Sequence, residues 1–259
     1  MEARIPAPLR PTALIGVLSP ASPAEEERIE QGLERLRSRG YRLREAPHAR
    51  ACLGYLAGSD EERAKDLMEL WADEEVEALF CLRGGYGTLR LLDRLDYSLF
   101  REHPKPLVGY SDITALQWAI WAKSKVVSFS GPMVAGLGEA DPFTWEKLWA
   151  MLERETWEGV LRDEARPLEV WRSGEAEGRL MPGNLSLIVS LMGTPYLPDL
   201  EGTILVLEDV GERPYRVDRA LNQLRLAGVF HRLAGLVLGD FGETFAESGP
   251  QEPWGLRRI

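Results

Sequence analysis

Short apolar segments alternate with amphipathic helical segments along most of this chain of 259 residues. Apolar segments at 12–18, 41–46, 78–82, 107–109 and 126–129 predict strands. Helical patterns separate them; one opens at Ser22-Pro23 as N-cap and first turn, and another has capping-box chemistry at Ser59-Asp60-Glu61-Glu62. Because strands that alternate with helices pair in parallel and are covered on both faces, the chain is predicted to have an α/β fold.

The same alternation resumes in the last third of the chain. Patterns predict a helix at 184–192, a strand at 203–207, a helix at 214–226 and a strand at 234–238. We therefore expect an N-terminal parallel-sheet domain at 1–135, of the flavodoxin-like or class I glutamine-amidotransferase-like type. A crossover at 136–166 and a smaller C-terminal α/β domain at 167–259 follow. The C-terminal domain is expected to be incomplete, because the last six residues look like the beginning of a helix.

Composition excludes several classes of function. The formal net charge is −10 and the sequence pI is near 5.0, whereas a general nucleic-acid binder carries a basic patch. The N-terminus lacks a signal peptide pattern, and no apolar run is long enough to span a bilayer. We expect a cytoplasmic protein that binds neither nucleic acid nor membrane.

The segment 108–114 combines a strand end, a tight turn with Ser111 and the start of a helix. This arrangement is typical of a nucleophile elbow, and it places the Asp112 N–H at a helix N-terminus where an oxyanion could bind. The Gly-x-Ser-x-Gly pattern is absent, because Ile113 occupies the last glycine position. Ser111 as a plain helix N-cap is the structural alternative.

Two further strand ends carry candidate residues. The glycine-rich segment 83–87 allows close backbone approach to a ligand, or it is simply a tight turn. The strand at 203–207 runs into Glu208, Asp209 and Glu212. A carboxylate there could orient a catalytic histidine, or the acids mark a solvated junction.

Taken together, these motifs resemble the LD-carboxypeptidases, also called muramoyltetrapeptide carboxypeptidases. The resemblance runs in order from about Ala13 to Phe241, with Pro182 where the family often has glycine. It rests on Arg83-Gly84-Gly85-Tyr86-Gly87, Gly109-Tyr110-Ser111-Asp112-Ile113-Thr114, Gly131-Pro132-Met133, Gly183-Asn184-Leu185-Ser186, Leu207-Glu208-Asp209-Val210-Gly211-Glu212 and Pro214-Tyr215-Arg216-Val217-Asp218-Arg219.

The resemblance implies a Ser-Glu-His triad. Ser111 matches the serine, and Glu208 matches the glutamate better than Glu212, which remains an alternative. The family's histidine lies in a later Gly-His segment that this sequence lacks. None of its three histidines, His48, His103 and His231, is expected to be the base.

The resemblance also implies the reaction, which is removal of the terminal D-alanine from murein tetrapeptide during peptidoglycan recycling. Ser111 would attack, and the N–H groups of Gly85 and Asp112 would form the oxyanion hole. Candidate substrate-binding residues are Arg83, Tyr86 and Asn184. No cofactor or metal is expected, and a homodimer is carried over from the family.

Two alternatives remain open at this point. One is a relative that hydrolyses a peptide-nucleotide antibiotic for self-immunity. The other is a non-catalytic ligand-binding homologue that lacks the triad histidine.

Overall fold

The computed structural model describes residues 2–156, 159 and 161–242, which form two compact units. The first unit extends to Ser173 and the second begins at Gly174. Helix α6 (Pro142–Leu152), which lies in the expected crossover 136–166, is part of the first unit.

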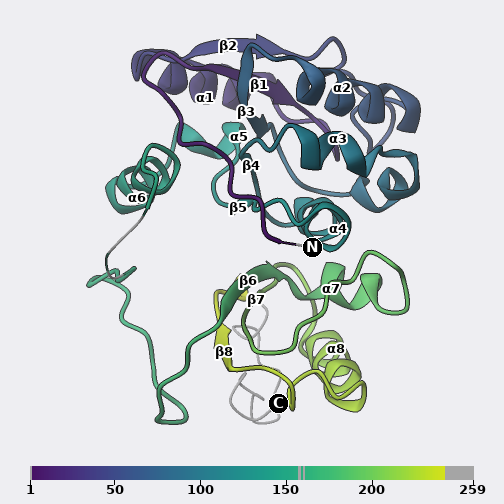
Figure 1. Cartoon of the computed structure of the whole chain (residues 1–259), viewed down its shortest axis with the longest axis vertical. Coiled ribbons are helices and arrows are strands. Elements are labelled where there is room, and N and C mark those ends of the chain that lie inside the picture. The colour runs from purple at the N-terminus through teal and green to yellow at the C-terminus, as the bar shows by residue number, and fades with distance from the viewer. Residues whose placement is uncertain (1, 157–158, 160, 243–259) are drawn as a thin grey trace, which may run out of the picture. The chain divides into compact units, whose positions relative to one another are not determined.

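The first unit is built on one parallel sheet of five strands (Figure 1). Its strand order is β2-β1-β3-β4-β5, so the chain adds strands first on one side of β1 and then on the other. This is the flavodoxin-like order, and the predicted α/β class is therefore confirmed. The strands are β1 (Leu14–Leu18), β2 (Arg42–Glu45), β3 (Val76–Cys81), β4 (Leu107–Gly109) and β5 (Phe129–Ser130).

Helices cover this sheet and pack on one another through their apolar side chains. Helix α1 buries Ile29, Leu33 and Leu36 at helical spacing, while α4 is buried around most of its circumference. The helical elements are α1 (Glu26–Ser38), α2 (Asp60–Ala72), the 3-10 turns η1 (Thr88–Arg90) and η2 (Leu92–Arg94), α3 (Tyr97–Glu102), α4 (Ile113–Ser124), α5 (Val134–Leu137) and α6.

The second unit has a parallel sheet of three strands in the order β6-β7-β8. It comprises β6 (Arg179–Asn184), α7 (Leu185–Leu191), β7 (Thr203–Glu208), α8 (Pro214–Leu226) and β8 (Gly235–Leu238). Strand β6 was not predicted, because Pro182 and Gly183 are unfavourable in strands; its position at the sheet edge tolerates a proline. Its pairing with β7 places Asn184 directly beside Glu208.

Local signals succeeded at some element ends and failed at others. The capping box at Ser59 is confirmed, with both of its hydrogen bonds present. The predicted cap at Ser22 is wrong, since α1 begins at Glu26 with Glu25 as its N-cap. The fifth strand, predicted at 126–129, is β5 and shares only Phe129 with that range. Before it, Lys125 adopts a left-handed conformation and Val126 forms an isolated bridge with Arg4.

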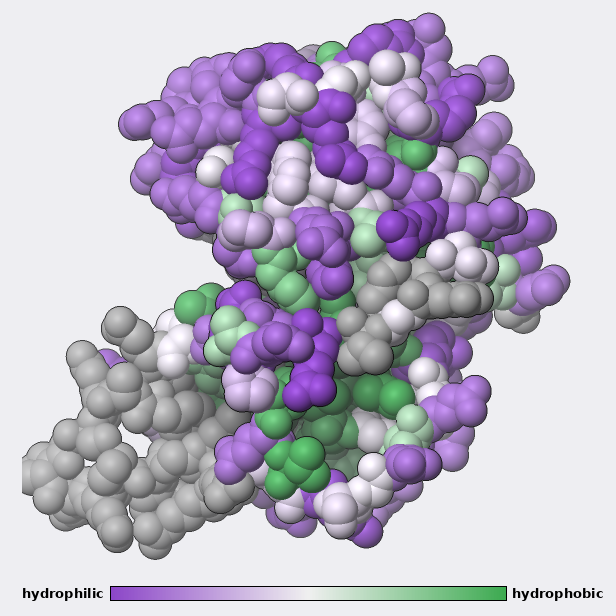
Figure 2. Space-filling view, turned by 90° about the vertical axis from the view of Figure 1, so that its left-hand side faces the viewer, coloured by the Kyte–Doolittle hydropathy of each residue, from purple (hydrophilic) through white to green (hydrophobic). Residues whose placement is uncertain are grey.

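Polar and charged side chains cover most of the visible surface of the first unit (Figure 2). Apolar side chains are more prominent on the second unit, where Leu180 of β6 and Leu236 of β8 are exposed. Within the residues that the structure describes, no helix has the length and apolar character required to cross a membrane.

The packing of α1 against α5 generates a stability prediction. A Cβ on Gly32 would lie 1.9 Å from the Val134 carbonyl oxygen, so Gly32→Ala must push the two helices apart. We expect a loss of about 1–3 kcal/mol in the free energy of unfolding, measured by urea denaturation. Gly136→Ala is the matched control, because a Cβ there meets no atom within 4 Å. Equal stability of the two variants would contradict this prediction.

Candidate active site

The turns that follow β1, β3 and β4 meet at one edge of the first sheet. Strand order reverses between β1 and β3, and ligands bind at such positions in open α/β sheets. A Cβ on Gly84, after β3, would lie 3.1 Å from the Ser111 Cβ and 3.3 Å from its Oγ, after β4. The glycine-rich turn therefore lies directly against the predicted nucleophile.

Ser111 has a left-handed backbone conformation, with φ of 61°. This conformation is unfavourable for serine, and it occurs between the end of β4 and the Asp112 N-cap of α4. Hydrogen bonds from Thr114 N–H to the Ser111 carbonyl (2.9 Å) and from Ile113 N–H to the Tyr110 carbonyl (3.3 Å) hold the turn. Within the described residues the Ser111 hydroxyl makes no hydrogen bond, so it does not act as a plain helix cap.

The Gly84–Gly85 peptide is oriented by the loop after β1. The Ser22 N–H donates to the Gly84 carbonyl at 3.2 Å, and in a trans peptide the Gly85 N–H then points the opposite way. Gly85 has φ of 106°, and a Cβ there would lie 2.4 Å from Ser22 Oγ. Only glycine therefore fits at this position.

Asp112 connects the glycine-rich turn to the nucleophile turn. Its buried carboxylate accepts a hydrogen bond from Thr88 N–H at 2.9 Å, and its carbonyl accepts one from Thr88 Oγ1 at 2.6 Å. Burial raises the pKa of Asp112, and the Thr88 hydrogen bonds oppose that rise. Within the described residues, neither the Gly85 nor the Asp112 N–H donates to a protein acceptor, which leaves both available to an oxyanion.

A recess of about 350 Å³ in the first unit is lined by Tyr110, the neighbour of Ser111, and by Arg83, the neighbour of Gly84. Arg28 and Glu25, at the start of α1, add one charge of each sign to its wall. The Arg83 guanidinium donates to the Pro23 carbonyl at 2.9 Å, which holds the side chain at this wall. Arg28 also pairs with Glu139 at 3.4 Å, so Arg83 is the cation of this recess better suited to a carboxylate close to the nucleophile turn.

The three acids at and after the end of β7, which are Glu208, Asp209 and Glu212, have different partners. Asp209 accepts hydrogen bonds from Asn184 Nδ2 (2.9 Å) and from the Ser186 N–H (3.0 Å) and hydroxyl (2.8 Å). Glu212 forms an ion pair with Arg216 Nε at 2.6 Å. Asp209 is thus occupied in holding the start of α7, and Glu212 in pairing with α8.

One carboxylate oxygen of Glu208 differs from those of its neighbours. Its Oε1 is buried and has no hydrogen-bond partner within the described residues. Burial, with a further contribution from the Asp209 charge, raises the pKa of Glu208 to about 7. A buried carboxylate oxygen without a donor is suited to receive an imidazole N–H.

None of the three histidines is bonded to Ser111 or Glu208 in the described part of the chain. His48 Nδ1 contacts Asp66 Oδ1 at 2.9 Å, and this hydrogen bond raises the pKa of His48. The His103 carbonyl accepts from Trp71 Nε1, and His231 is exposed in the second unit. The residues described also contain no group of three or more His, Cys, Asp and Glu side chains that could hold a metal ion.

Sequence reasoning missed the side chains that join these turns. Ser22 Oγ accepts from the Tyr86 N–H at 3.1 Å and donates to the Tyr55 carbonyl at 2.7 Å, and Thr88 bonds Asp112 as described above. Partners 24 to 64 residues apart leave no local pattern. Tyr86 is partly exposed, with its ring edge against Tyr55, and its predicted role toward substrate stays a prediction.

The raised pKa of Glu208 predicts a pH-dependent stability. The folded protein holds this proton more tightly than the unfolded chain, so the stabilisation is complete below pH 4.5 and is lost as the pH rises through about 7. Glutamine cannot ionise, so Glu208→Gln should gain stability relative to wild type between pH 4.5 and 8, by up to about 3 kcal/mol. Urea denaturation at both pH values measures this gain.

Glu201→Gln, which removes an exposed carboxylate from the same unit, controls for the general loss of a negative charge. A stability difference between Glu208→Gln and wild type that stays constant from pH 4.5 to 8 would contradict the prediction.

Comparison with known proteins places this geometry in a family. The chain is 41% identical over 230 residues to the probable murein peptide carboxypeptidase of Bacillus subtilis, covering 88% of this chain and 72% of that protein. It is 34% identical to the murein tetrapeptide carboxypeptidase of Pseudomonas aeruginosa, covering 88% and 76%. A solved structure of MccF in complex with glutamyl sulfamoyl guanosine is 28% identical, with a TM-score of 0.85 and coverage of 95% and 83%. Models of the LD-carboxypeptidase N-terminal and C-terminal domains match residues 15–131 and 177–258, so the chain belongs to the LD-carboxypeptidase family.

Proposed function

We propose that this protein is a serine carboxypeptidase that removes the terminal D-alanine from murein tetrapeptide. The observation that carries the proposal is the left-handed turn at Ser111, which adjoins Gly84. Beside it, the N–H groups of Gly85 and Asp112 donate to no acceptor among the described residues. Relatives named murein peptide and murein tetrapeptide carboxypeptidase support this substrate.

In the proposed reaction, Ser111 Oγ attacks the carbonyl carbon of the peptide bond before the terminal D-alanine. The carbonyl oxygen becomes an oxyanion, which accepts hydrogen bonds from the Gly85 and Asp112 N–H groups. The C–N bond breaks, the amine takes up a proton and D-alanine leaves. Water then hydrolyses the acyl-serine ester and regenerates Ser111.

The proton of Ser111 requires a base, which we propose to be a histidine oriented by Glu208. Glu208 suits this role better than Glu212, because Glu212 is paired with Arg216 while the Glu208 Oε1 has no partner within the described residues. The family resemblance assigns the histidine to a Gly-His segment that is absent from this sequence. We therefore propose that these 259 residues lack their base.

The recess beside Tyr110 is proposed to hold a charged part of the peptide. Arg83 would bind a carboxylate there, since a guanidinium forms paired hydrogen bonds with carboxylates. Tyr86 and Asn184 complete the proposed substrate contacts. A cytoplasmic location in peptidoglycan recycling and a homodimer remain predictions.

Likeness to the microcin C7 self-immunity protein MccF of Escherichia coli favours a second candidate function. The Escherichia coli MccF sequence is 30% identical to this chain over 264 residues. A solved MccF structure holds glutamyl sulfamoyl guanosine. The second candidate is hydrolysis of an aminoacyl sulfamoyl nucleoside. Parallel assays of D-alanine release from murein tetrapeptide and of glutamate release from glutamyl sulfamoyl guanosine separate the two candidates.

Replacement of the nucleophile gives the first functional prediction. Ser111→Ala should reduce to background even the slow D-alanine release expected of a chain without its base, because the proposed attacking oxygen is gone. The thermal unfolding temperature should stay within a few degrees of wild type. Ser38→Ala, which changes an exposed serine of α1, is the control and should release D-alanine at the wild-type rate. Turnover by Ser111→Ala would remove Ser111 from the mechanism.

The missing base gives the second functional prediction. The 259-residue chain should release D-alanine at least about 10²–10⁴-fold more slowly than the Bacillus subtilis relative assayed alongside, because general-base assistance is absent. His231→Ala should leave that slow rate unchanged. A rate equal to that of the relative, or one that falls on His231→Ala, would show that a base is present in this chain.

A further inference from the structure

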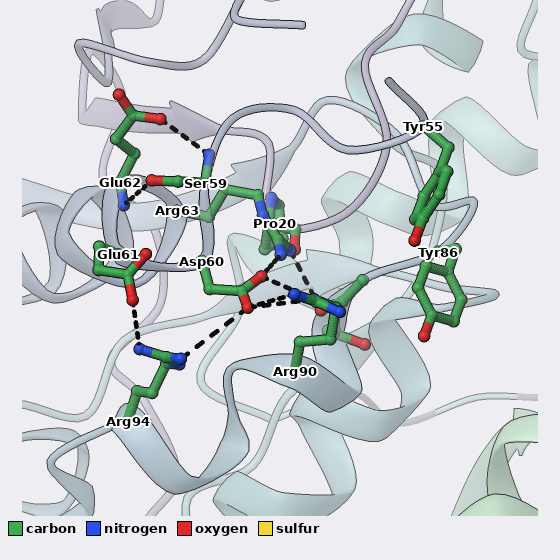
Figure 3. Close-up of polar contacts among 12 residues, drawn as sticks. Pro20, Tyr55, Ser59, Asp60, Glu61, Glu62, Arg63, Tyr86, Arg90 and Arg94 are labelled. Atoms are coloured by element: carbon green, nitrogen blue, oxygen red, sulfur yellow. Dashed lines mark hydrogen bonds and ion pairs between the residues drawn. The ribbon is translucent and has the colours of Figure 1, made fainter. Parts of the chain in front are cut away.

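Arg63 is a fully buried cation next to the turns of the candidate site (Figure 3). It lies in the first turn of α2, and its side chain has no exposed surface. One guanidinium nitrogen, Nη1, donates to the Pro20 carbonyl and, at 3.1 Å, to the Gly87 carbonyl. The other, Nη2, donates to Asp60 Oδ1. A single side chain therefore cross-links α2 to the turns after β1 and β3.

These two carbonyls lie on the segments that orient the proposed oxyanion donors. Pro20 is two residues before Ser22, whose N–H holds the Gly84 carbonyl and so sets the direction of the Gly85 N–H. Gly87 is followed by Thr88, which bonds both the carboxylate and the carbonyl of Asp112. Arg63 thus holds one segment at Pro20 and the other at Gly87, although it contacts neither the Gly85 nor the Asp112 N–H group.

The contact with Gly87 depends on the absence of a side chain there. A Cβ on Gly87 would lie 2.6 Å from Arg63 Nη1, and the glycine has φ of 139°. A side chain at position 87 would therefore displace the Arg63 guanidinium, although the two residues are 24 positions apart in the sequence.

The cation is itself held by a network of charges. Asp60 accepts hydrogen bonds from Arg90 Nε (2.8 Å) and Nη2 (2.7 Å) in addition to the bond from Arg63 (Figure 3). Arg94 approaches the same carboxylate at 3.9 Å. Asp60 therefore cannot move without breaking several charged contacts, and it holds the Arg63 fork in one orientation.

Stability alone does not account for this arrangement. Burial lowers the pKa of Arg63, with the Asp60 charge opposing the change, and the Arg63 Nε is buried without an acceptor within the described residues. A buried ion pair with an unpaired donor is often less stable than an apolar replacement of the same size.

We propose that Arg63 is a positioning residue that sets the direction of both oxyanion donors by holding the carbonyls of Pro20 and Gly87. This inference rests on the serine hydrolase function proposed above. Arg63 touches no reacting atom and acts only through Ser22, Gly84 and Thr88.

Arg63→Lys is the direct test, because lysine keeps the charge but cannot form the fork that reaches two carbonyls and Asp60 together. Hydrogen–deuterium exchange should speed up at least about tenfold at the Tyr86 and Thr88 amides, which are bonded to Ser22 and Asp112. The kcat for D-alanine release should fall about 10–10²-fold with KM within about twofold, since misplaced oxyanion donors weaken only the transition state.

Arg101→Lys is the matched control. Arg101 also holds two backbone carbonyls, those of Glu2 and Ser124, but Ser124 is at the opposite end of α4 from Ser111. This variant should leave amide exchange at Tyr86 and Thr88, and also kcat, at wild-type values. Equal losses in the two lysine variants would overturn the proposal by showing a general effect on stability.

Thr88→Val keeps the proposal testable if Arg63→Lys does not fold. Valine matches threonine in shape, and the Asp112 carbonyl keeps its bond from the Ala115 N–H, so the core stays satisfied. The variant should lower kcat at constant KM and speed exchange at the Thr88 amide. If both variants fold, unchanged amide exchange in Arg63→Lys and in Thr88→Val would overturn the positioning role. If the lysine variant does not fold, unchanged exchange in Thr88→Val overturns it alone.

The two readouts separate the inference from the function on which it rests. The wild-type chain is compared at the slow rate expected without its base. If it releases no D-alanine even at that rate, while the Bacillus subtilis relative assayed alongside does, the proposed substrate fails. Amide exchange then still decides whether Arg63 orders the turns. If wild type releases D-alanine and Arg63→Lys matches it in kcat, the positioning role fails and the proposed function stands.

Discussion

The hydrogen bonds between Thr88 and Asp112 hold the glycine-rich turn against the turn that carries Ser111. They form because the parallel sheet brings the ends of β3 and β4 to the same edge. Ser22 extends the connection to the turn after β1, so three turns from distant parts of the sequence form one polar network. That network sets the direction of the Gly85 and Asp112 N–H groups, which have no acceptor among residues 2–156, 159 and 161–242.

In each unit, hydrogen-bonded polar residues lie beside polar groups that have no partner among the described residues. In the first, buried hydrogen bonds fix backbone segments, and the N–H groups of Gly85 and Asp112 donate to no acceptor in the part of the chain that the structure describes. In the second, Asp209 accepts the hydrogen bonds that hold the start of α7, while its neighbour Glu208 has a buried oxygen without a partner in the described part of the chain. In both, a residue whose polar groups are hydrogen-bonded adjoins one with a polar group that has no partner among the described residues.

Prediction from the sequence succeeded where the physical cause is local. Ser59 caps α2 through residues three positions away, and β4 and α8 lie at their predicted positions because each pattern is complete within its segment. Prediction failed at Ser22, where a partner 64 residues away outweighs the local preference for a helix cap. Strand β6 was missed because an edge position, which no local pattern reveals, tolerates Pro182.

The sequence by itself determined the α/β class, the two regions of alternating elements and the motifs at 83–87, 108–114 and 205–212, since periodicity and turn residues are local properties. Tertiary structure alone decided the left-handed backbone of Ser111, the direction of the Gly84–Gly85 peptide and the burial of Arg63. It also decided which of the three acids retains a free oxygen among the described residues. These properties depend on partners brought together by strand order, and hydrogen bonding and desolvation act through space rather than along the chain.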